Sequence, residues 1–141
     1  MKKGYTAIAA IGLMIAALFI AQPASAATGS WAPKGGSFTI PSNWHCGTTT
    51  SGPRLSAQTC VVRSGNYVQA ATIVRNRASS GTTASVNQVL TENASAGVCA
   101  ASTIAARSIS VCMTPTVYHP ALVGAAADVT DIPGFIFAPR S

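Results

Sequence analysis

Few side chains in this chain can carry acid–base or nucleophilic chemistry. The candidates for a general acid or base are two histidines and three carboxylates, His45, His119, Glu92, Asp128 and Asp131. The histidines lie far apart in the sequence, and no G-x-S-x-G segment places a serine on a sharp turn. Hydrolysis and group transfer need an acid with a base, or a nucleophile held beside a base. We therefore expect a protein that is not an enzyme.

The segment Asp128-Val-Thr-Asp131 brings two carboxylates close together in the sequence. A calcium ion takes six to eight oxygen ligands, and two carboxylates supply too few of them. Asp commonly hydrogen-bonds the backbone of a turn, so we interpret both residues as turn-capping. No metal ion and no other cofactor is predicted.

Four cysteines, Cys46, Cys60, Cys99 and Cys112, are the next group with defined chemistry. An even number of cysteines in a small exported domain is typical of disulfides, and four cysteines allow three pairings. The short separations favour Cys46–Cys60 with Cys99–Cys112, and each bond would stabilise the fold by roughly 3 kcal/mol. A zinc site normally contains a close C-x2-C pair, which this sequence lacks. Two disulfides are therefore predicted.

The first 26 residues have the pattern of a secretory signal peptide. Lys2 and Lys3 precede an apolar run over residues 6–21, and the A-x-A site at residues 24–26 predicts cleavage after Ala26. The run is short for a membrane span, and Pro23 interrupts its end. We expect a secreted, extracellular protein with no membrane span after cleavage.

The mature chain, residues 27–141, has the size of one domain and a modest positive charge. Seven basic residues against three acidic ones leave a net charge near +4. The basic residues are scattered along the sequence, and only Arg75-Asn76-Arg77 approaches the dense stripe of a nucleic-acid surface. We expect no nucleic-acid partner, and we interpret the charge as favouring solubility and weak attraction to an anionic cell surface.

The mature sequence has strand signals throughout and few helix signals. Residues 27–36 are predicted to be a flexible lead-in, and 37–141 a single β-sandwich domain that starts with a strand at 37–40. Residues 58–63 and 67–75 are β-branched runs around Ser64-Gly65-Asn66, which indicates a hairpin. Alternation places Val68, Ala70 and Val74 on one face of the second run and Tyr67, Gln69, Ile73 and Arg75 on the other. About seven strands in all predict an all-β sandwich.

The stretch CVVRSGNYVQAATIVRN, followed by a Ser/Gly-rich turn, a strand and a C-x12-C loop, resembles a group of small secreted actinobacterial (Streptomyces-like) proteins. Most of that group have no known function. The resemblance covers about residues 44–129 and implies a single immunoglobulin-like β-sandwich with two disulfides. Its motifs are structural, so it implies no active site.

A second resemblance concerns the segment from Val111 to Pro120, which is similar to the reactive-loop region of the Streptomyces subtilisin-inhibitor family. Size, secretion and two disulfides also match, whereas the cysteine spacing differs from that of the family. The likeness implies an inhibitory loop with Met113 or Thr114 near the scissile position, followed by Val117 and Tyr118. Inhibition of an extracellular hydrolase, such as a subtilisin-like protease, is therefore the alternative function.

Exposed aromatic side chains suggest a second kind of partner, because β-sandwiches bind carbohydrates through them. The candidates are Trp31, Trp44, Tyr67 and Tyr118. We expect Trp44 to pack against a disulfide and Trp31 to be exposed in the lead-in. The sequence thus predicts a non-catalytic binding module whose partner is unknown, with a cell-surface glycan and an extracellular hydrolase as the two candidates.

Overall fold

A computed structural model describes residues 28–92 and 94–141 of the chain. The predicted signal peptide, residues 1–26, lies outside this part. Over the described residues the fold is all β, and no helix there is long and apolar enough to cross a membrane. The strands are β1 Ser30–Gly35, β2 Trp44–Cys46, β3 Thr50–Ser51, β4 Leu55–Ser64, β5 Tyr67–Asn76, β6 Thr82–Leu90, β7 Ser95–Ile104, β8 Ile109–Met113, β9 Val117–Tyr118, β10 Ala125–Val129 and β11 Ile136–Ala138.

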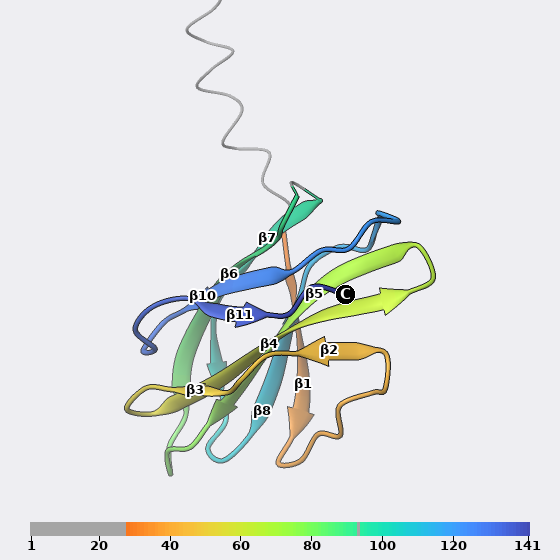
Figure 1. Cartoon of the computed structure of the whole chain (residues 1–141). Helices are drawn as coiled ribbons and strands as arrows, with labels where there is room; N and C mark the ends of the chain where they lie inside the picture. Colours follow the sequence, from red (N-terminus) through yellow and green to blue (C-terminus); the bar gives the residue numbers. More distant parts are fainter. Residues whose placement is uncertain (1–27, 93) are drawn as a thin grey trace, which may run out of the picture.

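The strands form two antiparallel sheets that face each other (Figure 1). The large sheet has the order β1-β8-β5-β4-β2, with β3 added to β4 and β9 added to β5. The small sheet has the order β11-β10-β6-β7. The prediction of an all-β sandwich is confirmed. It has eleven strands rather than about seven, because strands of two or three residues are too short to show a periodic pattern.

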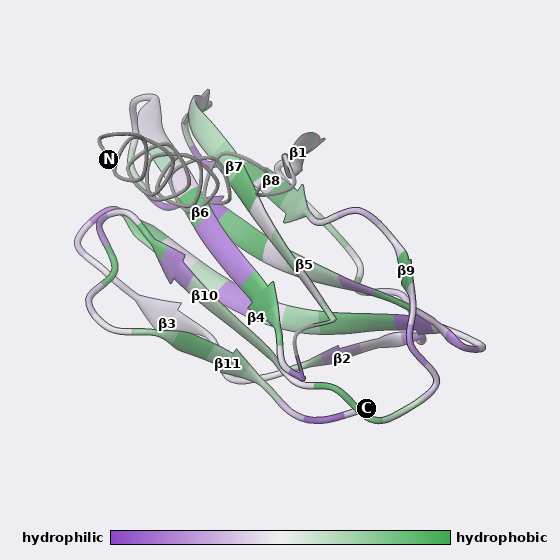
Figure 2. Ribbon diagram, turned by 90° about the horizontal axis from the view of Figure 1, so that it is seen from above, coloured by the Kyte–Doolittle hydropathy of each residue, from purple (hydrophilic) through white to green (hydrophobic). Residues whose placement is uncertain are grey.

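The β4–β5 hairpin is the centre of the large sheet, and its register matches the predicted alternation. Val68, Ala70 and Val74 are fully buried in the apolar clusters between the sheets. Ile73 belongs to a separate cluster on the opposite face of the large sheet. The predicted division of the two faces of β5 is therefore confirmed. Figure 2 shows hydrophobic segments on strands of both sheets.

A chain of buried polar side chains also crosses the space between the sheets. The hydroxyl of Thr72 donates to Oε1 of Gln88 at 2.7 Å and lies 3.2 Å from the hydroxyl of Thr59. Nε2 of Gln88 donates to the carbonyl of Cys112 at 3.0 Å. These polar groups are hydrogen-bonded to one another, so the core tolerates their burial.

Both predicted disulfides are confirmed, and they do different structural work. Cys46–Cys60 joins two residues that already face each other on β2 and β4 of the large sheet. Cys99–Cys112 joins β7 of the small sheet to β8 of the large sheet, within the main core cluster. Only the second bond therefore links the two layers covalently, as the conserved disulfide of immunoglobulin domains does.

The prediction of a flexible lead-in over residues 27–36 is wrong for residues 30–35, which form β1 and pair with β8. Pro33 fits there because β1 is an edge strand, where a missing N–H is tolerated. Trp31 is half-buried rather than exposed, and its Nε1–H donates to the carbonyl of Ala100 at 2.8 Å. This contact ties β1 to the small sheet as well.

The predicted strand at residues 37–40 is also absent, and the segment instead lies over the outward face of the large sheet. Phe38 and Trp44 pack together there, with ring centroids 5.5 Å apart, against a cluster that includes Cys60 and Cys46. Trp44 thus packs beside a disulfide, as expected. Phe38 covers apolar side chains of the sheet. An apolar residue in such a covering segment gives the same short alternating pattern as a strand.

Candidate functional site at the two ends of the sandwich

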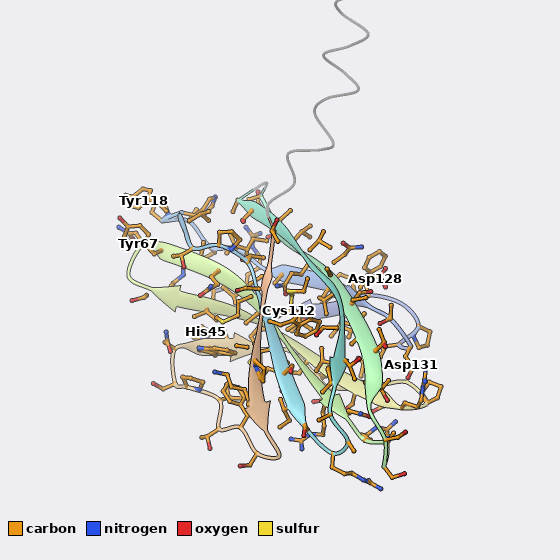
Figure 3. All side chains as sticks on the ribbon, turned by 180° about the vertical axis from the view of Figure 1, so that it is seen from behind. His45, Tyr67, Cys112, Tyr118, Asp128 and Asp131 are labelled. Atoms are coloured by element: carbon orange, nitrogen blue, oxygen red, sulfur yellow. A yellow bond between two sulfur atoms is a disulfide. The ribbon has the colours of Figure 1, made fainter. Side chains whose placement is uncertain are left out.

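One end of the sandwich carries two exposed tyrosines, and we call it the tyrosine end. Tyr67 at the start of β5 pairs in register with Tyr118 of β9. The two residues are 54% and 62% exposed, and their ring centroids lie 5.6 Å apart in an edge-to-face arrangement. Figure 3 shows the two rings side by side at the edge of the molecule. Of the four aromatic candidates from the sequence, these two are exposed and brought together by the fold, whereas Trp31 and Trp44 are half-buried.

A single arginine organises the loops behind the tyrosines. The guanidinium of Arg63 donates to the main-chain oxygens of four residues, Gly65, His119, Ala121 and Ser141. The main-chain N–H of His119 also donates to the carbonyl of Asn66 at 2.7 Å. Tyr118 therefore stands on a segment that is fixed on both sides, and the positive charge of Arg63 is directed at the protein itself.

The residues predicted as an inhibitory loop, 113–119, do not form one loop. Met113 ends strand β8 and is half-buried. Thr114 is only 2% exposed, and its hydroxyl and main-chain N–H are both hydrogen-bonded to the main chain of Ala70. Val117 and Tyr118 are paired with β5 as strand β9, Val117 half-buried and Tyr118 exposed. The Met113–Thr114 peptide, at the predicted scissile position, therefore lies within the sheet.

The opposite end of the sandwich gathers positive charge, and we call it the basic end. Five of the seven basic residues between 28 and 141 lie there: Lys34, Arg54, Arg75, Arg77 and Arg107. All five are exposed. Residues that are scattered along the sequence thus converge in the fold. Four chain segments that are distant in sequence end at the same place, because Gly35 and Arg75 both pair with Ile109 and the main-chain N–H of Arg77 bonds to Arg54.

A buried asparagine holds the basic end together. Asn76 is fully buried, and its Nδ2 lies 2.8–3.2 Å from the carbonyl oxygens of Ser80, Ile104 and Ala105. Its Oδ1 accepts from the main-chain N–H of Ala78 and from the hydroxyl of Thr82. One amide therefore joins the β5–β6 loop to the β7–β8 loop. These two loops carry Arg77 and Arg107, so Asn76 fixes their spacing.

Among the described residues, the one carboxylate at the basic end is Asp131. It accepts hydrogen bonds from the main-chain N–H groups of Arg54 and Leu55 and forms an ion pair with the Arg54 guanidinium at 3.2 Å. The hydrogen bond from the main chain of Arg54 is the largest cause that lowers the pKa of Asp131 below its usual value, and partial burial opposes it. Both aspartate oxygens are thus engaged by the protein, as expected of a turn-capping residue.

The remaining acid–base candidates are dispersed. Glu92 forms an ion pair with Arg140 at 3.0 Å, at the tyrosine end. Asp128 is exposed within strand β10 of the small sheet, so its interpretation as a turn-capping residue is wrong. His45 is exposed on β2 of the large sheet. Nδ1 of His119 lies 3.2 Å from the carbonyl of Ala121. Within residues 28–92 and 94–141, no three His, Cys, Asp or Glu side chains are grouped as metal ligands would be.

The basic end is the feature that sequence reasoning missed. The segment Arg75-Asn76-Arg77 did carry a signal, since strand alternation from Val74 points Asn76 inward and both arginines outward. The convergence of Lys34, Arg54 and Arg107 on it depends on the strand order, which no local pattern encodes.

The chain matches no protein-family model, no curated protein and no solved structure. Its functional interpretation therefore rests on the geometry of the two ends.

Proposed function

We propose that this protein is a secreted, non-catalytic binding module that contacts a cell-surface glycan through Tyr67 and Tyr118. The proposal rests on one observation: two tyrosines with neighbouring rings are 54% and 62% exposed. Secretion is supported by the predicted signal peptide and by two disulfides, which persist in oxidising compartments.

The chemistry of the pair suits a sugar ring. A tyrosine offers an apolar ring face together with a polar hydroxyl tip, and an exposed pair can contact an amphipathic ligand with both. Two amide side chains lie near the pair: Asn66 is exposed in the adjoining turn, and Gln69 lies on the same face of β5, with its Nε2 donating to the carbonyl of Thr114 at 2.7 Å. A sugar has apolar C–H faces and hydroxyl rims, so rings and amides together match both of its surfaces.

The rigidity of the tyrosine end supports binding as well. Arg63 and the β5–β9 pairing fix the segment that carries Tyr118 before any ligand arrives. A contact surface that is already ordered loses less conformational entropy on binding. We expect affinity to depend on ring contact rather than on a change of loop structure.

The alternative function, inhibition of a subtilisin-like protease, has less support from the fold. A protease must reach the scissile peptide in an extended, accessible segment. Thr114 is 2% exposed and hydrogen-bonded to Ala70, so its peptide group is inaccessible without opening the sheet. The glycan function is therefore our choice.

Co-sedimentation of the oxidised 27–141 protein with insoluble peptidoglycan, chitin, cellulose and xylan tests the proposal. We expect retention on at least one polymer and an affinity at least about tenfold lower in the Tyr67→Ser, Tyr118→Ser double variant, since aromatic anchors dominate such contacts. Phe135→Ser is the matched control, because Phe135 is 67% exposed and neighbours a second exposed ring, Phe137. Equal retention of the double variant and the wild type, or no retention of the wild type, would overturn the glycan site.

Titration of subtilisin with the same protein separates the alternative. Our proposal requires full residual protease activity at a one-to-one ratio. Stoichiometric loss of activity that Met113→Ala abolishes would instead establish an inhibitor.

A further inference from the structure

The basic end carries charge that the fold does not neutralise. Five cationic side chains share it with a single carboxylate, and that carboxylate is already bonded to Arg54 and to main-chain N–H groups. Exposed like charges at close quarters disfavour the compact state. Arg77 donates to the carbonyl of Gly52 and Lys34 lies over the ring of Phe38, so these two cations also have contacts within the fold. Among residues 28–92 and 94–141, no hydrogen bond or ion pair engages the side chains of Arg75 and Arg107, so these two arginines call for an explanation outside stability.

The arginines surround a defined hollow. It is lined by Arg75, Asn76, Arg77 and Arg107 and has a volume of about 400 Å³. Asn76 is fully buried, and its amide is hydrogen-bonded to the β5–β6 loop and to the end of β7. A neutral, fully buried side chain therefore joins the loops that carry Arg77 and Arg107. It fixes the spacing of these loops before a ligand binds.

Arg107 provides an independent observation. Its main chain has φ of +57°, in the left-handed region that glycine and asparagine adopt most readily. It lies in the four-residue loop between β7 and β8, with its N–H donating to the carbonyl of Ala78. A backbone position that disfavours arginine nevertheless holds one at the rim of the hollow. Strained residues of this kind concentrate at functional sites.

We infer that the basic end is a binding site for a polymer that carries repeated phosphate groups. A guanidinium presents its N–H groups as a planar fork that matches phosphate oxygens. A tetrahedral phosphate accepts hydrogen bonds from several directions at once, and the arginines here border the hollow from two segments, the end of β5 with its following loop and the β7–β8 loop. Lys34 and Arg54 extend the charge beyond the hollow, which favours a ligand with more than one phosphate.

This site is distinct from the proposed glycan site. Tyr67 and Arg75 lie on the same face of β5, separated by eight residues, or about 26 Å of strand. A polymer bound at the basic end therefore leaves the tyrosines accessible. The two sites can fail or succeed independently in experiments.

Binding of the oxidised 27–141 protein to poly(glycerol phosphate) and to inorganic polyphosphate, measured calorimetrically from 20 to 200 mM NaCl, tests the inference. We expect binding whose logarithm falls linearly with the logarithm of the salt concentration, with a slope of about −2 to −3 if three or four phosphates are neutralised. Polyphosphate binding without poly(glycerol phosphate) binding would assign a free rather than a cell-wall source of the phosphates.

Matched single variants distinguish binding at the basic end from a general effect of the protein's net charge. Arg75→Gln, Arg107→Asn and Arg140→Gln each remove one positive charge, but Arg140 lies at the tyrosine end in an ion pair with Glu92. We expect a loss of about three- to tenfold in affinity for the first two and less than twofold for the third. Asparagine at position 107 suits the left-handed backbone, so this variant keeps its fold. Equal losses in all three variants, or no binding at 20 mM NaCl, would overturn the site.

Single-stranded DNA of matched phosphate number completes the experiment. Weaker binding of DNA than of poly(glycerol phosphate) supports a site that recognises phosphate alone. Tighter binding of DNA would overturn our assignment in favour of a nucleic-acid partner. The Tyr67→Ser, Tyr118→Ser variant should bind the phosphate polymers as the wild type does, whatever its behaviour on polysaccharides.

Discussion

The tyrosine end and the basic end are each held together by one side chain that bonds the main chain of neighbouring loops, but the two side chains differ in charge. At the tyrosine end this side chain is Arg63, whose guanidinium is hydrogen-bonded to main-chain oxygens. At the basic end it is the neutral amide of Asn76. The cations there, such as Arg75 and Arg107, are left on the surface.

This difference shows that the side chains that join the loops need not be those that contact a ligand. A buried amide both donates and accepts, so Asn76 satisfies N–H and carbonyl groups alike. A guanidinium only donates, so Arg63 can gather carbonyls alone. At the tyrosine end the inward-facing side chain is the cation Arg63, and the exposed surface is aromatic. At the basic end the inward-facing side chain is the neutral Asn76, and the exposed surface is charged.

Removal of the Asn76 side chain should have the largest effect. Asn76→Ala leaves several buried main-chain groups without partners, and we expect a loss of about 3 kcal/mol or more in the free energy of unfolding, measured by urea denaturation. Asn66→Ala, at the exposed turn of the tyrosine end, is the control and should change stability by less than about 0.5 kcal/mol. Equal effects of the two would show that Asn76 does not hold the loops.

Replacement of Arg63 tests the other support. Arg63→Lys keeps the charge but offers one nitrogen instead of the fork, so we expect a loss of about 2 kcal/mol in urea denaturation. Affinity for phosphate polymers should not change, because this charge is directed inward. An Arg63→Lys variant that is as stable as the wild type but binds phosphate polymers more weakly would contradict this assignment. Arg63 would then bind the ligand and not support the loops.

The carboxylate of the basic end should make stability depend on pH. The native pKa of Asp131 lies below the ordinary value of 3.8, so its hydrogen-bonded carboxylate contributes stability that is present at neutral pH and is lost as the pH falls below about 4. The urea midpoint of Asp131→Asn should therefore fall less between pH 6 and pH 3 than that of the wild type. Glu92→Gln, at the exposed pair with Arg140, should change the free energy of unfolding at pH 6 by less than about 1 kcal/mol.

The smallest effect concerns the backbone of Arg107. Glycine or asparagine relieves a left-handed arginine, so Arg107→Gly should leave stability unchanged or raise it by up to about 1 kcal/mol. Thermal unfolding monitored by circular dichroism is sensitive enough to detect this. A clear loss of stability would mean that the Arg107 side chain supports the fold, which would weaken the argument for a binding role.

The sequence was most informative where the signal is local. The β4–β5 hairpin, the division of faces around Val68 and Ile73, and both disulfides follow from alternation, turn composition and cysteine spacing. β1 was missed because Gly, Ser and Pro near Trp31 suggest a loop, whereas pairing with β8 and the Trp31–Ala100 bond override that preference. Burial of Thr114 was equally invisible, since it depends on a partner, Ala70, that is distant in sequence.

The candidate sites divide in the same way. Tyr67 and Tyr118 were recognisable as aromatic candidates, but only the β5–β9 pairing makes them neighbours. The basic end depends on the order of strands in the large sheet, which brings Gly35, Ile109 and Arg75 into one row. Strand order is set by packing of the whole domain, so local sequence patterns do not predict that these charges converge.

Both ends of the described chain lie on the side of the tyrosines. β1 runs from that side toward the basic end, and Ser141 is hydrogen-bonded to Val123 and Arg63 (Figures 1 and 3). A fusion partner, affinity tag or sensor-chip linkage attached at either terminus would therefore crowd the tyrosines and leave the arginines pointing outward. Assays on immobilised protein would favour phosphate ligands for this geometric reason, and attachment through an engineered cysteine near residue 79 would reverse the bias.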